Sequence, residues 1–300
     1  MGINPYIFRE YDIRGKAQWD FTDEVAGLLG RGLGSYFQQK GEQDVVVCHD
    51  NRASSSRLNG ALNKGLLSTG CNVIDIGENP TPVCYFALHH LARTAGVMIT
   101  GSHNPPEDNG FKISSGGSTI YGQEIQRVRE IIDSGTFSSG TGQVISCDMG
   151  EPYLNHLTSI IQLQRPLKIV VDAGSGTAGP LALELYRRLG CEVVGLYCDP
   201  DHCFPFHHPD PTVPENLRDL QQRVLQEKAD VGLAFDGDGD RLGVVDDRGS
   251  IIWGDILQIL FWREILPQHP GTPVIVEVKC SQALVEEAKR LGGRLSPGIF

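Results

Sequence analysis

The sequence lacks the features that would tie the protein to a membrane, to nucleic acid or to an oxidising compartment. Its eight cysteines include no C-x-x-C pair, which fits buried free thiols in a reducing compartment better than a disulfide framework. No apolar run is long enough to cross a bilayer, and the first 15 residues contain no signal-peptide core. The net charge of -11 disfavours a nucleic acid or an anionic membrane as partner, because either requires a basic surface. We therefore expect a cytoplasmic protein.

What the sequence does contain is a repeat. Residues 44–77, 167–198 and 272–296 each run from a β-rich segment through a small-residue turn and an amphipathic helical stretch to another apolar segment. This pattern predicts three successive βαβ units. The first two units continue through a second helical stretch to a third strand, at 95–100 and 229–235, whereas the third unit stops. We expect an α/β fold with two complete repeats and a truncated third one.

Unusual polar loops follow the third strands of both complete units. These loops read GSHNPPEDNG at 101–110 and DGDGDRLG at 236–243. The carboxyl ends of parallel strands are where α/β sheets place ligands. Both loops are therefore candidate functional loops.

The second loop alternates aspartate with glycine. Two glycines allow the backbone to fold tightly enough to aim Asp236, Asp238 and Asp240 at one point. Three hard oxygen ligands suit Mg²⁺, although a solvated acidic turn would look the same. An EF-hand is excluded, because Arg241 and Asp247 stand where glycine and glutamate are needed.

The first loop offers a hydroxyl beside polar donors. Ser102 is expected to be exposed, with His103 and Asn104 next to it and Lys112 on the outgoing strand. The loop is not a nucleophile elbow, because it lacks the second glycine of G-x-S-x-G. Its side chains suit a hydroxyl that carries a phosphoryl group, since positioning and charge neutralisation dominate that chemistry. A turn-rich connection remains the alternative.

Four motifs in order, FREYDIRG, TGSHNPPEDNGFKI, HHPDPTVPENL and DGDGDRLGVVD, closely resemble the α-D-phosphohexomutase superfamily, within it the bacterial phosphomannomutase/phosphoglucomutase group. The resemblance extends to about Gly293. It implies that Ser102 is a phosphoserine and a ligand, with the three aspartates, of one Mg²⁺. It also implies that the reaction centre is formed by Tyr11, Arg14, His103, Asn104 and Lys112. Arg241 is implied to contact a phosphate or the sugar.

The resemblance further implies an intramolecular phosphotransferase of the isomerase class. It would interconvert hexose 1-phosphate and 6-phosphate, of mannose or glucose, through a hexose 1,6-bisphosphate. Domains of mixed-sheet type are expected at 1–150 (serine loop), 151–252 (metal loop) and 253–300 (truncated), with a fourth domain absent. Such a chain should be impaired in catalysis, and either monomeric or weakly self-associating through the third domain. A non-catalytic phosphosugar-binding or partner protein is the alternative.

Three other motifs have competing interpretations. GSGTAG at 174–179 satisfies a dinucleotide-binding fingerprint but is favoured as a tight βα turn. DHCFPFHH at 201–208 could bind Zn²⁺ but is favoured as a structural loop. The polar turn at 51–56, which contains Arg52, is interpreted as a helix N-cap.

Overall fold

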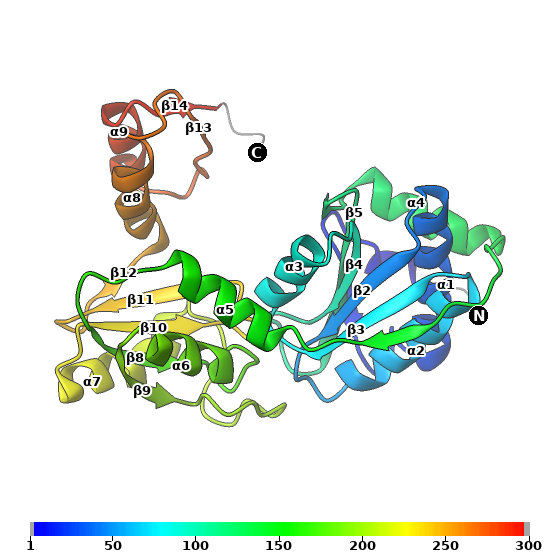
Figure 1. Ribbon diagram of the computed structural model, residues 1–300, viewed down its shortest axis with the longest axis horizontal. Coiled ribbons are helices and arrows are strands. Elements are labelled where there is room, and N and C mark those ends of the chain that lie inside the picture. The colour runs from blue at the N-terminus through cyan, green and yellow to red at the C-terminus, as the bar shows by residue number, and fades with distance from the viewer. Residues whose placement is uncertain (1–2, 297–300) are drawn as a thin grey trace.

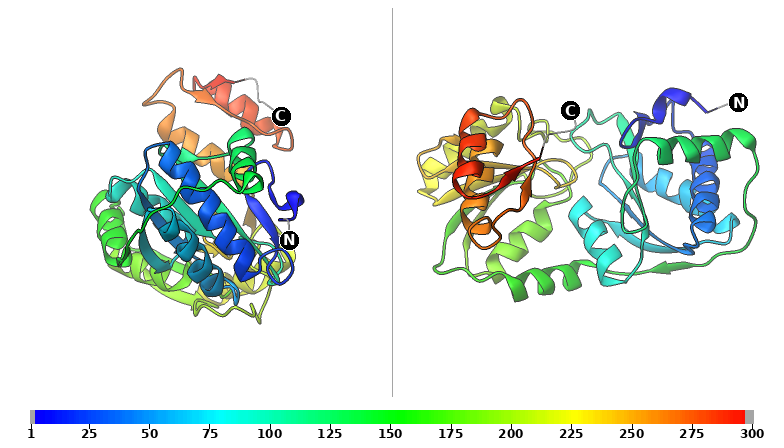
Figure 2. Two further views of the ribbon diagram at one scale, coloured as in Figure 1. Left: turned by 90° about the vertical axis from the view of Figure 1, so that its right-hand side faces the viewer. Right: turned by 90° about the horizontal axis from the view of Figure 1, so that it is seen from above.

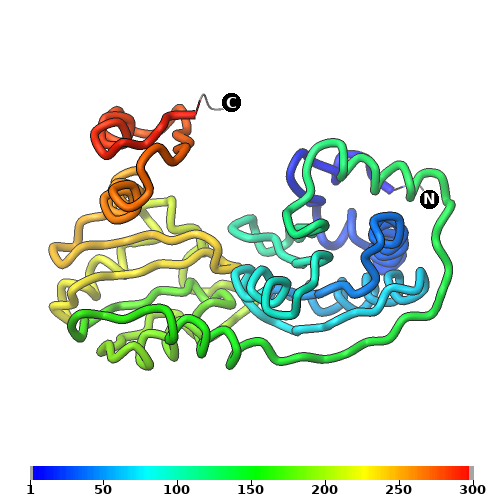
Figure 3. Tube along the Cα trace, turned by 45° about the horizontal axis from the view of Figure 1, so that its top comes forward, coloured from blue at the N-terminus to red at the C-terminus, as the bar shows by residue number. Residues whose placement is uncertain are grey.

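The computed structural model describes residues 3–296, which form two large α/β sheets side by side and a small third unit that stands on the second (Figures 1 and 2). The chain crosses from the first sheet to the second by a long path along one side, which Figure 3 shows in green. The predicted α/β fold with mixed sheets is confirmed. Among the described residues, no helix has the length and apolarity needed to span a membrane.

The first sheet has the order β1-β5-β4-β2-β3-β7, and β6 pairs with β5. Strands β4, β2, β3 and β7 are parallel, whereas β1 and β5 are antiparallel to their neighbours. The elements are η1 Pro5–Ile7, β1 Ile13–Lys16, α1 Asp23–Gln39, β2 Asp44–His49, α2 Ser55–Ser68, β3 Asn72–Glu78, α3 Thr81–His90, β4 Ala95–Ile99, β5 Asp108–Ser115, β6 Ser118–Thr119, α4 Gln123–Ser134 and β7 Val144–Ser146.

Alternate residues of the central strands enter two different cores. Val45 and Val47 of β2 belong to a cluster with side chains of α1, α2 and α4, whereas Val46 and Cys48 pack with side chains of α3. This follows from the two-residue period of a strand, which sends successive side chains to opposite faces. Helices therefore cover both faces, and the apolar run of β2 is explained.

The second sheet repeats this plan in the order β12-β11-β10-β8-β9. Strands β9, β8 and β10 are parallel, and β11 and β12 are antiparallel. The elements are α5 Gly150–Ile160, β8 Lys168–Asp172, α6 Gly179–Arg188, β9 Glu192–Leu196, η2 Pro214–Leu217, α7 Arg218–Glu227, β10 Val231–Phe235, β11 Leu242–Asp246 and β12 Ile251–Ile252. The two predicted third strands, β4 and β10, therefore occupy equivalent places, and each is followed by a candidate functional loop.

The third unit contains α8 Gly254–Ile265, β13 Pro273–Val274, α9 Gln282–Arg290 and β14 Arg294–Leu295. Its two strands are parallel, as a βαβ unit requires. The β-rich segment that begins the third predicted unit forms only two strand residues, and Ile275 and Val278 are mostly exposed. Among the described residues, β13 pairs with β14 alone, so nothing extends the ladder. The outer face of α8 exposes four large apolar side chains: Ile256, Leu260, Phe261 and Ile265.

Candidate active site

The serine loop leaves β4 and returns through β5. Ser102 has φ of +51°, a left-handed conformation that is uncommon outside glycine, and its N–H donates to Thr100 Oγ1 at 2.7 Å. The side chain was expected to be exposed, and this is wrong: Ser102 is 3% exposed. The reason is that the acidic loop of the second sheet lies against it.

The two candidate loops meet at one point. Ser102 Oγ donates to Asp236 Oδ2 at 2.8 Å, although the residues are 134 positions apart. Asp236 Oδ1 accepts the N–H groups of Asp240 and Arg241, both at 3.0 Å, which folds the acidic loop around it. A Cβ on Gly237 would lie 2.6 Å from the Ser102 carbonyl oxygen, so only glycine allows this approach.

The three carboxylates of the acidic loop converge. One oxygen of each of Asp236, Asp238 and Asp240 lies within 4.8 Å of the others. Lys112 Nζ contacts both Asp238 and Asp240 at 2.6 Å. Thr81, at the start of α3, donates its hydroxyl to Asp238 Oδ2 at 2.6 Å. The first sheet thus supplies a cation and a hydroxyl to a loop that belongs to the second sheet.

The negative charge of the three aspartates exceeds the positive charge of Lys112. Burial, together with the nearby charges of Asp238 and Asp240, raises the pKa of Asp236 to about 7. Burial also opposes ionisation of Asp238, but Lys112 outweighs it and holds the pKa of Asp238 below its usual value. Burial also opposes the charge of Lys112, but Asp238 and Asp240 outweigh it and raise the pKa of Lys112, so Lys112 is a cation.

The residues of the acidic loop fit a hard divalent metal ion. Asp238 Oδ1 is buried and has no hydrogen-bond partner within residues 3–296, which is costly for a carboxylate oxygen and leaves one ligand position free. Converging carboxylates are the donor set that Mg²⁺ prefers. Asp236, Asp238 and Asp240, with Ser102 Oγ beside Asp236, are the residues that would hold the ion.

The remaining predicted residues lie at different distances from the serine. Arg14 donates to Asn104 Oδ1 at 2.9 Å and pairs with Asp12 at 2.7 Å. His103 Nδ1 lies 3.2 Å from Ser102 Oγ, and burial and the nearby Arg241 lower the pKa of His103. Tyr11 and Arg241 are exposed. Among the described residues, no hydrogen bond joins either side chain to Ser102 or the carboxylates.

The structure corrects the interpretation of the polar turn at 51–56. Ser54 makes no side-chain capping bond to α2. Arg52 is buried instead, and its guanidinium contacts the serine loop. Sequence reasoning therefore missed Arg52, as it missed Thr81. The D-x-R spacing of Asp50 and Arg52 was the one signal present, since a carboxylate two residues before an arginine can hold it in place.

The glycine-rich turn and the histidine-rich loop both serve packing. A Cβ on Gly176 would lie 2.6 Å from the Gly237 carbonyl oxygen, so the GSGTAG turn supports the acidic loop. His208 contacts the carbonyl oxygen of His103, and His207 contacts Asp172. Neither histidine joins the exposed group of Asp201, His202 and Cys203. The favoured readings as a βα turn and a structural loop agree with these contacts.

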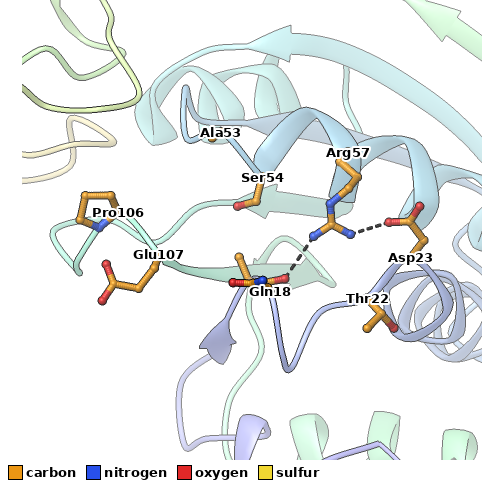
Figure 4. A pocket seen from close by; sticks show the side chains of 9 residues that line it. Gln18, Thr22, Asp23, Ala53, Ser54, Arg57, Pro106 and Glu107 are labelled. Carbon is orange, nitrogen blue, oxygen red and sulfur yellow. Dashed lines mark hydrogen bonds and ion pairs between the residues drawn. The ribbon is translucent and has the colours of Figure 1, made fainter.

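A cavity of about 600 Å³ lies beside the serine loop (Figure 4). Arg57 lines it, pairs with Asp23 and donates to the carbonyl oxygens of Ala17 and Phe21. Pro106 and Glu107 of the serine loop line the cavity, but Ser102 and the three aspartates do not. The cavity is therefore separate from the point where the two loops meet.

The contact between His207 and Asp172 makes stability depend on pH. Burial lowers the pKa of His207, but the Asp172 carboxylate at 3.0 Å outweighs burial and raises this pKa above its usual value of 6.5. A histidine whose pKa is higher in the folded than in the unfolded protein stabilises the fold. This stabilisation is complete at a pH below the pKa of the unfolded state and is lost as the pH rises through the pKa of the folded state. We expect the free energy of unfolding to fall above pH 6.5 in the wild type and to fall less in His207→Gln. Urea unfolding at several pH values measures this, with His202→Gln, an exposed neighbour, as control.

The arrangement defines a class: repeated α/β units in which a buried serine of one repeat faces a carboxylate cluster of the next. The chain matches the phosphoglucomutase/phosphomannomutase α/β/α domain I over residues 5–139 and domain II over residues 151–249. It belongs to the phosphoglucomutase/phosphomannomutase family. This family confirms the resemblance of the four sequence motifs.

Comparison with individual relatives gives the same result. The chain is 46% identical over 288 residues to phosphomannomutase/phosphoglucomutase of Pseudomonas aeruginosa, a match that covers 96% of this chain and 62% of the relative. A phosphoglucomutase/phosphomannomutase family protein of Burkholderia thailandensis is 42% identical, with a TM-score of 0.93, over 98% of this chain and 66% of that one. The chain therefore spans just under two thirds of the length of these relatives.

A more distant enzyme shares the fold. Aspergillus fumigatus N-acetylphosphoglucosamine mutase was solved in complex with GlcNAc-6P and magnesium, with 15% identity and a TM-score of 0.56 over 94% of this chain and 60% of that one. A variant of the same enzyme was solved with glucose 1,6-bisphosphate, at 12% identity and a TM-score of 0.57, over 99% of this chain and 64% of that one.

Proposed function

We propose that the serine loop and the acidic loop carry the phosphoserine and the metal site of a phosphohexomutase. This enzyme would interconvert hexose 1-phosphate and 6-phosphate, of mannose or glucose. The observation that carries the proposal is the hydrogen bond of 2.8 Å from Ser102 Oγ to Asp236, which brings the two candidate loops together. Membership of the family supports it. The domains would be 1–150, 151–252 and 253–300.

The proposed chemistry is an exchange of phosphoryl groups at Ser102 Oγ. A sugar hydroxyl attacks the phosphorus of phosphorylated Ser102: a P–O bond to the sugar forms, the bond to Oγ breaks, and the proton of the sugar hydroxyl ends on the released Oγ. In the return step, Oγ attacks the other phosphorus of the hexose 1,6-bisphosphate, the P–O bond to the sugar breaks, and the proton of Oγ ends on the sugar oxygen. When bound at the acidic loop, Mg²⁺ would offset the negative charge of the phosphoryl group.

The side chains of the site would hold and neutralise the phosphoryl group. Lys112 is fixed as a cation by two carboxylates and supplies charge. Arg14 donates to Asn104 Oδ1, and this bond would hold the segment after the serine. His103 contacts Oγ, and the exposed side chains of Tyr11 and Arg241 would contact the sugar or its second phosphate.

Intact-mass measurement tests the proposal directly. Incubated with glucose 1,6-bisphosphate and Mg²⁺, the protein should gain one phosphoryl group on Ser102, and a hexose monophosphate should remove it. A protein that stays unmodified and is indifferent to Mg²⁺ would instead indicate a non-catalytic phosphosugar-binding or partner protein.

Turnover by residues 1–300 alone is expected to be slow. The longer relatives contain a further third of their length, and binding energy from parts of the substrate remote from the reacting centre supports kcat as well as affinity. Losing several charge-assisted contacts, each worth about 1.5–3 kcal/mol, would lower kcat/KM by orders of magnitude. A coupled assay with hexose bisphosphate and saturating Mg²⁺ measures it. Turnover of order 10 s⁻¹, a common enzyme rate, would contradict the expectation.

The exposed apolar face of α8 supports weak self-association of the same chain. Four large side chains of one helix are presented to solvent there, and such patches favour association. Analytical ultracentrifugation over a range of concentrations distinguishes a monomer from a weak dimer.

A further inference from the structure

Every donor of the Arg52 guanidinium is used, and four of the five meet the serine loop and the start of β5. An arginine side chain has five N–H groups, and here each has its own acceptor. Four of the acceptors are backbone carbonyl oxygens of the serine loop and the start of β5, and the fifth is a carboxylate. The acceptors and distances are Ser102 O 2.7 Å, Asn104 O 2.7 Å, Pro105 O 2.6 Å, Asp108 O 3.1 Å and Asp50 Oδ2 3.2 Å.

Asp50 fixes the guanidinium from behind. Its carboxylate accepts the Arg52 N–H at 3.0 Å, the Ser55 hydroxyl, and the Gly101 N–H at 3.3 Å. The same carboxylate therefore holds both the arginine and the residue before Ser102. Asp50 is 2% exposed and the Arg52 side chain 1% exposed, so water does not compete for these bonds.

Two neighbours flank the guanidinium of Arg52. A Cβ on Gly101 would lie 2.5 Å from Arg52 Cζ, so the glycine before Ser102 is required by the arginine. On the second sheet's side, the Phe204 ring lies over the guanidinium, 5.6 Å from ring centroid to Cζ. Arg52 is thus enclosed between the serine loop and the loop at 201–208 of the second sheet.

We propose that Arg52 is a positioning residue for phosphoryl transfer at Ser102. Its guanidinium holds the carbonyl groups from 102 to 108 in one arrangement, which keeps Ser102 in its left-handed conformation and aims Oγ at the acidic loop. The inference rests on the proposed function. It goes beyond the residues that face the phosphoryl group, because Arg52 acts only through the backbone of the loop.

The arginine is specific for this role. Lysine carries the same charge but only three N–H groups on one atom, so it cannot serve five acceptors spread along the loop. Arg52→Lys should therefore leave at least two of the five acceptors, and so at least one backbone carbonyl group, without a donor. Arg57→Lys is the matched control, since the Arg57 guanidinium also donates to backbone carbonyl oxygens, but to those of Ala17 and Phe21 instead of the serine loop.

The experiment compares three measurements on the full chain. In Arg52→Lys, amide hydrogen exchange in the serine loop should speed up by at least about tenfold. Phosphorylation of Ser102 by glucose 1,6-bisphosphate, per folded molecule, should slow by about 100-fold, the cost of a misplaced reacting atom. Mg²⁺ affinity of the unphosphorylated protein should fall far less than the rate of phosphorylation, because the three aspartates belong to the acidic loop, which keeps its own bonds. Arg57→Lys should change neither loop exchange nor phosphorylation.

A second variant covers the case in which Arg52→Lys does not fold. Gly101→Ala keeps the arginine but pushes its guanidinium away, and should give the same fast loop exchange and slow phosphorylation. Wild-type exchange and phosphorylation in the folded variants would overturn the inference, as would equal losses in Arg57→Lys. Failure of the proposed function looks different: the wild type itself would take up no phosphoryl group, while loop exchange would still respond to Arg52.

Discussion

Replacing Ser102 with alanine is expected to abolish covalent phosphorylation of the protein by hexose bisphosphate. The Oγ atom is the proposed point of attachment, and removing it leaves no acceptor at the place where the two loops meet. The fold should survive, since the bonds of the Ser102 N–H and carbonyl groups do not involve the side chain. Intact-mass and peptide mapping after incubation with glucose 1,6-bisphosphate measure the effect.

Ser175→Ala is the matched control for this substitution. Ser175 is also buried, with φ of +59°, and lies in the glycine-rich turn of the second repeat. Alanine meets the same backbone strain at both positions, so only the hydroxyl at 102 should matter. Undiminished phosphorylation of Ser102→Ala, or equal loss in Ser175→Ala, would remove Ser102 from the proposed role.

Replacing Asp238 with asparagine is expected to weaken Mg²⁺ binding by at least about 100-fold. Substitutions of residues that only contact metal ligands already lower metal affinity by about 10- to 100-fold, and Asp238 is a proposed ligand itself. Asparagine has nearly the same shape but no charge. Asp238 is fully buried, and its Oδ1 atom is the orphaned oxygen of the cluster. Isothermal titration calorimetry of the unphosphorylated protein gives the affinity.

A carboxylate outside the cluster provides the comparison. Asp246 lies at the end of β11 opposite to the acidic loop, where it accepts the N–H groups of Arg248 and Ser250 in a turn. Asp246→Asn should disturb that turn and leave Mg²⁺ affinity unchanged. If Asp238→Asn binds Mg²⁺ as tightly as the wild type, the acidic loop is not the metal site.

Local patterns in the sequence were sufficient for the architecture. The repeated βαβ arrangement depends on two- and 3.6-residue periods and on glycines at helix ends, all of which are relations between near neighbours. The same holds for the acidic loop, because Asp236, Asp238 and Asp240 are too close in the chain to point far apart once the glycines allow a tight turn. The place of both loops followed from the strands before them.

Contacts between distant residues were beyond such patterns. Thr81 is separated from Asp238 by 157 positions and Lys112 by 126, and no local period indicates that they meet. The burial of Ser102 was mispredicted for this reason: a turn-rich polar loop is ordinarily exposed, and only the docking of the second repeat covers it. Arg52 was misread as part of a helix cap because four of its five acceptors are backbone carbonyls, which every residue has and no side chain identifies.

The sequence by itself determined which chemical groups stand at the ends of which strands, since periodicity and turn residues encode the path of the chain over short distances. The tertiary structure decided which of these groups face one another. Packing of two repeats placed a serine hydroxyl against a carboxylate, enclosed Arg52 beneath the loop, and left the outer face of α8 in solvent. Those outcomes depend on the close approach of whole surfaces, for which Gly101 and Gly237 leave the space that any Cβ would fill.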